Sequence, residues 1–81
     1  MSNHAPLRGA LIGAGFFAAF QADAWNRMDS ARILAVADGL TGRAQEFAAR
    51  WGIPGSYESV EEMLDKEELD FVDIVTRPSS H

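Results

Sequence analysis

A glycine motif near the start of the chain has residue types suited to binding a diphosphate. Residues Gly13 to Ala18 read Gly-Ala-Gly-Phe-Phe-Ala and directly follow the apolar run 7–12. Gly13 would let the chain turn tightly out of a strand, Gly15 would let the backbone approach a pyrophosphate, and Ala18 would let the next helix lie close to the sheet. Free amides at the start of that helix would face the phosphates. The predicted phosphate-binding residues are Gly13, Ala14, Gly15, Phe16, Phe17 and Ala18.

An acidic residue stands where a dinucleotide site needs one. Asp38 closes a second apolar run, 33–37, about twenty residues after the glycine motif. At the tip of a strand, its carboxylate would accept hydrogen bonds from both hydroxyls of an adenosine ribose. The alternative is a turn or helix N-cap residue, because Gly39 follows and aspartate is common at such positions.

Asp38 also bears on the choice of coenzyme. Its charge would repel the 2′-phosphate of NADP, since like charges about 4 Å apart cost on the order of 1 to 4 kcal/mol. NAD is therefore expected over NADP. Arg43 opposes this preference, because a guanidinium on the following helix could stack on adenine or reach a 2′-phosphate. The alternative for Arg43 is an ordinary solvent-exposed helix residue with no contact to the coenzyme, and the sequence favours neither.

Composition argues against several other classes of partner. The 81 residues carry a formal net charge of −5, and the seven Lys and Arg form no basic stripe, which argues against nucleic acid and anionic membranes. Cysteine is absent, and the two histidines, His4 and His81, lie at opposite ends, so no metal site is expected. No segment has the roughly twenty apolar residues that cross a bilayer. A cytoplasmic protein is the default expectation.

Apolar runs alternate with helical patterns along the chain. We expect a flexible tail at 1–6. Four strands are expected at 7–12, 33–37, 56–57 and 71–75, with a helix between each strand and the next. Connections too long for hairpins predict right-handed crossovers and a parallel sheet. The expected fold is α/β, a partial Rossmann fold of about four strands in the order 3-2-1-4 with helices on both faces. Residues 7–81 then form the N-terminal part of a dinucleotide-binding domain.

The first helix, from about 16 to 28, is expected to bury an apolar stripe. Its members recur at three- and four-residue steps and are Phe17, Phe20, Ala24 and Met28. The aromatic residues of the chain are expected in the core rather than against adenine. They are Phe16, Phe17, Phe20, Trp25 and Trp51, of which Phe16 is the exception because it is close to the phosphates.

The next two helices have recognisable ends. Thr41 is the expected N-cap of the second helix, and Gly52 is its expected end. Ser59 and Glu62 fit a capping box at the start of the third. The stripes expected to be buried are Ala44, Phe47, Ala48 and Trp51 in the second helix and Val60, Met63 and Leu64 in the third.

Four sequence blocks together resemble one protein family. They are Gly13 to Ala18, Val36-Ala37-Asp38 followed by Arg43-Ala44, Phe47 to Pro54, and Val72 to Thr76 with His81 five residues after the threonine. In this order they resemble the N-terminal half of the glucose-fructose oxidoreductase and inositol dehydrogenase (Gfo/Idh/MocA) family. The resemblance covers nearly the whole chain. Gln21 departs from it, because many relatives carry a histidine there.

The resemblance implies a function and site residues. Members of the family bind NAD or NADP and oxidise or reduce sugars, polyols and related carbonyl compounds by hydride transfer. By resemblance, residues 13–18 hold the pyrophosphate and Asp38 the ribose, and the nicotinamide side is lined by Thr76, Arg77, Pro78 and His81. The family's catalytic lysine, in a Glu-Lys-Pro motif, and its substrate domain are expected beyond this sequence, so this chain alone is not expected to catalyse. The alternative is a nucleotide-sensing or ligand-free Rossmann module.

The last predicted strand, 71–75, carries two further expectations. Asp73 lies in a strand expected to be buried, where an unpaired carboxylate is costly, so a bond to Arg8 or to a backbone amide is expected. The outer edge of this strand lacks the neighbour of a complete Rossmann sheet, which leaves Val72, Ile74 and Val75 without their expected partner strand. Such an edge invites pairing with another chain, so self-association is predicted.

Overall fold

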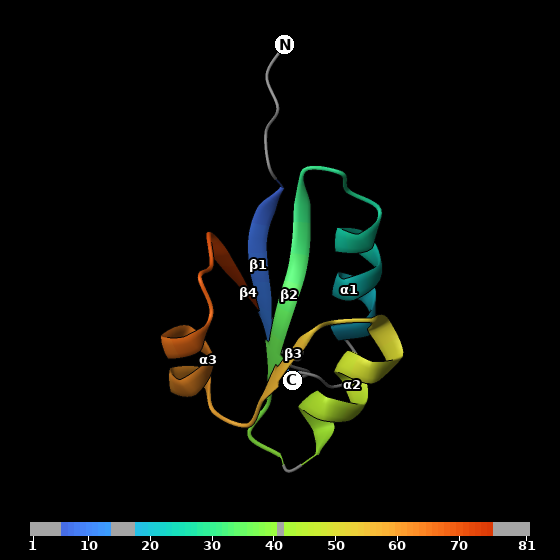
Figure 1. Cartoon of the computed structure of the whole chain (residues 1–81). Coiled ribbons are helices and arrows are strands. Elements are labelled where there is room, and N and C mark those ends of the chain that lie inside the picture. Colours follow the sequence, from blue (N-terminus) through green and yellow to red (C-terminus); the bar gives the residue numbers. More distant parts are fainter. Residues whose placement is uncertain (1–5, 14–17, 41, 76–81) are drawn as a thin grey trace, which may run out of the picture.

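Strands and helices alternate along the chain in the computed structural model, which describes residues 6–13, 18–40 and 42–75. Figure 1 shows the seven elements in order. They are β1 (Leu7–Ile12), α1 (Ala18–Asn26), β2 (Ala31–Ala37), α2 (Arg43–Trp51), β3 (Gly55–Tyr57), α3 (Val60–Lys66) and β4 (Phe71–Ile74).

The four strands form one parallel sheet in the order β3-β2-β1-β4, which confirms the predicted fold class and strand order. β1 and β2 are the central strands and pair along their whole lengths. The helices α1 and α2 cover one face of the sheet, and α3 covers the other (Figure 1). The connections from β1 to β2 and from β2 to β3 therefore cross one face of the sheet, and the connection from β3 to β4 crosses the other.

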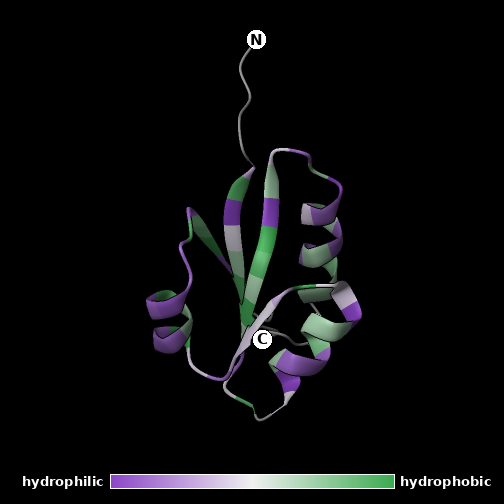
Figure 2. Cartoon of the chain, in the orientation of Figure 1, coloured by the Kyte–Doolittle hydropathy of each residue, from purple (hydrophilic) through white to green (hydrophobic). Residues whose placement is uncertain are grey.

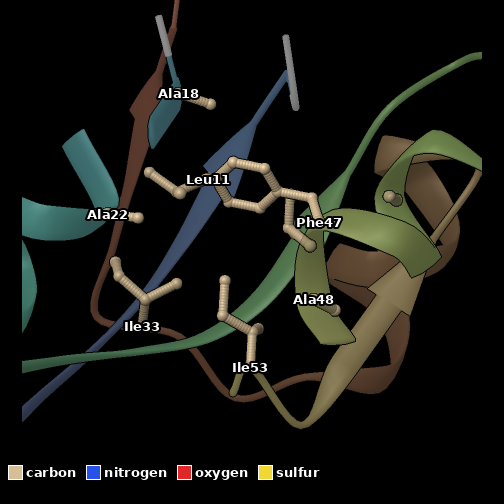
Figure 3. Close-up of a cluster of buried hydrophobic side chains, with 9 residues drawn as sticks. Leu11, Ala18, Ala22, Ile33, Phe47, Ala48 and Ile53 are labelled. Carbon is tan, nitrogen blue, oxygen red and sulfur yellow. The ribbon is translucent and has the colours of Figure 1, made fainter. Parts of the chain in front are cut away.

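A separate core fills each face of the sheet. On the face covered by α1 and α2, side chains of β1 and β2 meet both helices (Figure 3). The buried members of this core are Leu11, Ala18, Ala22, Ile33, Val36, Ala44, Phe47, Ala48 and Ile53. The smaller core under α3 consists of Ala10, Ala35, Ala37 and Met63. Figure 2 shows hydrophobic residues concentrated on β1, β2 and β4, while α3 is mainly hydrophilic and α2 carries residues of both kinds.

An irregularity in β2 sets which residues reach the larger core. The pairing of β1 with β2 shifts between Gly9 and Ala10, so that Leu34 has no partner in the register. One extra residue in a strand reverses the alternation of side chains beyond it. Ile33 and Val36 consequently both contribute to the core beneath α1 and α2, although three positions separate them.

The predicted stripe of α1 is wrong where the structure describes it. Phe20 and Met28 are 62% and 48% exposed, Ala24 is exposed, and Phe17 lies outside the described residues. The buried face of α1 instead presents Ala18 and Ala22 to the sheet. Apolar residues occur all around this alanine-rich helix, so their spacing does not single out one face. Close approach to the sheet selects the smallest side chains.

The second helix follows its predicted pattern except at its N-cap position. Its buried residues are those of the expected stripe, and Trp51 packs against the same core. Gly52 ends the helix with φ +70, a left-handed conformation that favours glycine, as predicted. The N-cap position belongs to Gly42 at φ +80 with no side-chain cap, whereas the predicted cap, Thr41, lies outside the described residues.

The third helix begins at the predicted Ser59. The Ser59 Oγ accepts a hydrogen bond from the Glu62 backbone N–H at 3.2 Å, which is the N-cap half of the expected capping box. Met63 is fully buried and Val60 packs against the smaller core, as expected. Leu64 was expected to be buried as well, and this is wrong because it is 52% exposed. It directly follows the buried Met63, and successive side chains of an α-helix point about 100° apart, so Leu64 is turned away from the position of Met63.

Candidate functional site

The carboxyl ends of β1, β2 and β4 meet at one edge of the sheet. Ile12, the last residue of β1, pairs with Ala37 of β2 on one side and with Ile74 of β4 on the other. The Gly13 N–H donates to the Ala37 carbonyl at 2.7 Å, and the Val75 N–H donates to the Ile12 carbonyl at 2.9 Å. This is the edge of the sheet at which open α/β folds bind ligands, in a crevice beyond the carboxyl ends of the strands.

Gly13 occupies a position that requires glycine. Its φ is +100, and a Cβ built there would lie 3.1 Å from the Val75 carbonyl oxygen. A side chain would therefore be strained by the backbone conformation and would press on the end of β4. With a side chain at this position, the end of β4 would have to move by a few tenths of an ångström.

Ala18 is the first residue of α1 and is completely buried. It packs in the larger core with Leu11 of β1 and Ala22 of the next helical turn (Figure 3). A methyl side chain at this position lets the first turn of α1 lie against the sheet. The start of the helix is thereby fixed next to the end of β1.

Asp38 stands one residue beyond β2, beside the end of β1. Its Oδ1 accepts a hydrogen bond from the Leu40 backbone N–H at 2.8 Å, and its own N–H donates to the Tyr57 carbonyl at 3.1 Å. The alternative interpretation of Asp38 as a turn residue is thus correct for this oxygen. The turn fixes the half-buried carboxylate at the tip of the strand. The turn and the predicted role toward ribose do not exclude each other, because a carboxylate can accept several hydrogen bonds.

Arg43 lies on the same side of the site as Asp38. It is the first residue of α2, it is half-buried, and its backbone N–H donates to the Leu40 carbonyl at 3.1 Å. The loop 38–42 therefore connects a carboxylate and a guanidinium at the end of β2. This is the side where the adenosine of a dinucleotide lies in Rossmann folds.

The remaining predicted site residues lie outside the described part of the chain. On the phosphate side these are Ala14, Gly15, Phe16 and Phe17, and on the nicotinamide side Thr76, Arg77, Pro78 and His81. Of the described residues that border them, Gly13 lies beside Val75 at the carboxyl edge of the sheet, and Ala18 and Val75 both pack in the larger core.

The sequence matches a model of an oxidoreductase family, Gfo/Idh/MocA, whose members have an NAD-binding Rossmann fold, over residues 7–81. The chain belongs to this family. Its parallel sheet, its glycine at the end of β1 and its acid at the end of β2 are the features of an NAD-binding Rossmann domain.

Named relatives cover the same part of the domain. The D-apiose dehydrogenase of Paraburkholderia graminis is 42% identical over 74 residues, which are 91% of this chain and 20% of that protein. The D-apiose dehydrogenase of Rhizobium rhizogenes is 38% identical over 79 residues, or 98% of this chain and 23% of that protein. A crystal structure of an oxidoreductase from Agrobacterium radiobacter in complex with NAD⁺, L-tartaric acid and magnesium is 37% identical, with a TM-score of 0.83 over 90% of this chain and 21% of that one. The Rossmann domain described here thus spans about a fifth of these relatives.

The local structure of the Rossmann domain fits a dinucleotide. At Gly13 the end of β1 carries no side chain, and the Val75 carbonyl oxygen lies 3.1 Å from the place where a Cβ would be. This is the arrangement that lets amides at a helix start reach a pyrophosphate. Within the described residues, no three His, Cys, Asp or Glu gather in a way that could hold a metal ion. No helix in the described ranges is long and apolar enough to cross a membrane.

Sequence reasoning missed a polar cluster beneath the Rossmann site. A bond from Asp73 to Arg8 or to a backbone amide was expected, but among the described residues its partners are different. Its Oδ2 accepts from the Trp25 Nε1–H at 2.8 Å and its Oδ1 from the Gln21 Nε2–H at 3.5 Å. Arg8 instead pairs with Glu68 and Asp70 at the amino end of the sheet. The available signal was the four-residue spacing of Gln21 and Trp25, which places two donors on one face of α1.

A groove lies at the other end of the Rossmann domain. It has a volume of about 380 Å³ and is formed by the last turn of α1 and the first residues of β2, including Trp25, Asn26, Met28 and Arg32. Ligands of open α/β sheets bind at the carboxyl ends of the strands, and this groove lies at the amino ends. It is therefore not the candidate coenzyme site.

Proposed function

We propose that this chain is the coenzyme-binding part of an oxidoreductase that transfers hydride between a nicotinamide coenzyme and a sugar, polyol or related carbonyl compound. The observation that carries the proposal is the conformation of Gly13. Its φ is +100, and it lies at the end of β1 next to β4, where the strand order of the sheet reverses. The names of the relatives support the substrate class, because two of them are D-apiose dehydrogenases.

Each predicted site residue has a part in this proposal. Main chain of residues 13–18 would hold the pyrophosphate, with the amides at the start of α1 facing its charge. Asp38 would hold the adenosine ribose, and Arg43 would lie on the adenine side. Thr76, Arg77, Pro78 and His81 would line the nicotinamide side, where the bound coenzyme supplies the hydride donor or acceptor. Groups that act on the substrate would belong to the four-fifths of the relatives that this chain does not cover, so the chain alone would not catalyse.

The proposal includes a preference for NAD over NADP, which Asp38 supports. A variant that separates charge from structure is Asp38→Asn, because its amide oxygen can still accept from the Leu40 N–H. Calorimetric titration of the wild-type chain should give tighter binding of NAD⁺ than of NADP⁺. In Asp38→Asn the preference should shrink by about fivefold or more, which corresponds to at least about 1 kcal/mol of removed repulsion.

The titration distinguishes the parts of the proposal. Tighter binding of NADP⁺ by the wild-type chain would contradict the preference but leave coenzyme binding intact. Saturation by neither coenzyme at millimolar concentration would contradict the proposed function itself. Asp65→Asn is a matched control for loss of one negative charge, since Asp65 is an exposed residue of α3, on the opposite face of the sheet from α1 and α2.

We further propose that the chain self-associates through the outer edge of β4. Among the described strands β4 pairs only with β1, so its other edge presents backbone N–H and C=O groups. Val72 and Ile74 are 40% and 61% exposed on this strand. An exposed apolar strand edge is a template for pairing with another chain.

A further inference from the structure

The carboxylate of Asp73 accepts hydrogen bonds from neutral side chains of another element rather than from a cation. Asp23, Glu62, Glu68 and Asp70 form ion pairs with Lys or Arg at the surface. Asp73 is half-buried on the sheet face beneath α1, and it accepts hydrogen bonds from the neutral donors of Trp25 and Gln21. A charged acceptor makes stronger hydrogen bonds than a neutral one, and it loses more if they are broken in a partly buried place.

These bonds bridge two elements that otherwise do not touch extensively. α1 packs its small residues, Ala18 and Ala22, toward β1 and β2, and its long side chains reach over β1 to β4. Gly9 of β1 makes this possible, because the ring of Phe71 occupies the place where a Cβ of residue 9 would be. The Phe71 ring in turn lies 4.7 Å from the Trp25 ring, measured between centroids.

The bridge joins the two sides of the candidate coenzyme crevice. α1 begins at Ala18, the last residue of the glycine motif, while Asp73 lies two residues before Val75, whose carbonyl is close to Gly13. Packing of alanine methyls is non-directional and allows a helix to slide or roll by small amounts. Hydrogen bonds to one carboxylate fix both the rotation of α1 and its distance from β4, because their geometry is narrow.

We propose that Asp73 is a positioning residue of the coenzyme site, which holds the phosphate-binding start of α1 at a fixed distance from the end of β4 through Trp25 and Gln21. Binding groups placed in advance cost less to order when the ligand arrives. The inference rests on the proposed coenzyme function and adds a specific cause of its affinity. Asp73 itself would not touch the coenzyme.

The test compares NAD⁺ affinities of fully folded variants by calorimetry. Trp25→Phe retains the ring beside Phe71 and removes the N–H donor, so the Kd for NAD⁺ should rise by roughly fivefold. Asp73→Leu should raise it by at least as much. Asp73→Asn retains an acceptor oxygen for the Trp25 N–H and should stay within about twofold of the wild type, since one good hydrogen bond is kept.

Trp51→Phe is the matched control. Trp51 is also half-buried and lies beside an aromatic ring, that of Phe47 at 6.1 Å, yet its buried Nε1 has no hydrogen-bond partner among the described residues. Its replacement should cost stability by loss of packing while leaving the Kd for NAD⁺ within about twofold, because no hydrogen bond is broken.

The outcomes separate this inference from the function on which it rests. Unchanged NAD⁺ affinity in Trp25→Phe, or equal weakening in Trp25→Phe and Trp51→Phe, would overturn the positioning role while coenzyme binding stands. Failure of the wild-type chain to bind NAD⁺ would overturn the proposed function, and the positioning role with it. If Asp73→Leu does not fold, the comparison of Trp25→Phe with Trp51→Phe still decides the question.

Discussion

Gly13 has two properties that no other described glycine has together. It has a positive φ, and a Cβ at this position would contact the main chain of another strand. Gly42 and Gly52 also have a positive φ, but nothing lies within 4 Å of a Cβ built there. Gly13 is therefore the residue at which backbone conformation and the shape of the crevice depend on each other.

Replacing Gly13 should damage both the fold and the site. In Gly13→Ala, we expect unfolding in urea to show a loss of about 1 to 3 kcal/mol, the usual cost of a side chain in a sparsely populated backbone conformation. NAD⁺ binding should weaken as well. Gly39→Ala is the control, because Gly39 has no positive φ and open space around its Cβ position. Equal stability of Gly13→Ala and Gly39→Ala would contradict the expected strain of a side chain at position 13.

Individual residues were predictable from sequence where the local chain decides their place. Gly13 and Asp38 lie at strand ends because apolar runs precede them, and both runs form strands. The partner of Asp73 was not predictable, because Trp25 lies 48 positions away and reaches it across another strand. Nothing local to Asp73 distinguishes a tryptophan donor from an arginine or an amide.

At the scale of the element, α1 shows the limit of periodicity. α2 has hydrophilic residues on one side and apolar residues on the other, so its spacing identified the buried face correctly. In α1, alanine and aromatic residues occur on every side of the helix, so the spacing does not identify one buried face. Phe20 was therefore wrongly expected to be buried. The crowded space against β1 and β2 admits Ala18 and Ala22, while Phe20 stays exposed. Size, rather than hydrophobicity, selects the face.

The outer edge of β4 gives a prediction for an element. A charge on an edge strand disfavours further strand pairing, so Ile74→Lys should shift the chain toward monomer in sedimentation velocity. The wild-type chain should form dimers or larger species under the same conditions. Met28→Lys is the matched control, because Met28 is also an exposed apolar residue, but lies at the end of α1 and away from this edge. A monomeric wild-type chain at high micromolar concentration would contradict the proposed pairing.

At the scale of the whole molecule, β4 is attached to the sheet by polar groups at its start. The Asp70 Oδ2 accepts from the Arg8 backbone N–H at 2.7 Å, and the Asp70 N–H donates to the Arg8 carbonyl at 2.6 Å. The Arg8 backbone N–H, together with its guanidinium, lowers the pKa of the Asp70 carboxyl below its ordinary value of 3.8. Ionised Asp70 therefore stabilises the attachment of β4 to β1.

This shift predicts a dependence of stability on pH. A carboxyl group whose pKa is lowered by folding stabilises the native state above its unfolded pKa, and the benefit is lost as pH falls through the lower folded value. In urea unfolding at a series of pH values, Asp70→Asn should lose stability less steeply than the wild type below about pH 4. Asp65→Asn, at an exposed position of α3, should follow the wild type. Parallel curves for Asp70→Asn and wild type would contradict the role of Asp70.

The order of elements and the topology of the sheet were predictable because each strand and each crossover has its own local signal. Glycine and proline mark the ends, apolar runs mark the strands, and parallel pairing follows from long connections. The side-chain network that joins α1 to β4 was not predictable, because it depends on how Gly9 lets Phe71 lie over β1. Sequence thus predicted where the site lies, but not what holds its two sides together.

The most direct test of the account is an NMR titration of the chain with NAD⁺, following the amide shift of each residue. We predict that the largest changes occur at residues 13–18, with smaller ones at Asp38 and Leu40, because main-chain amides at the start of α1 would face the pyrophosphate. Amides that stay unchanged there, with changes instead around Arg32 in the groove at the opposite end of the strands, would contradict it.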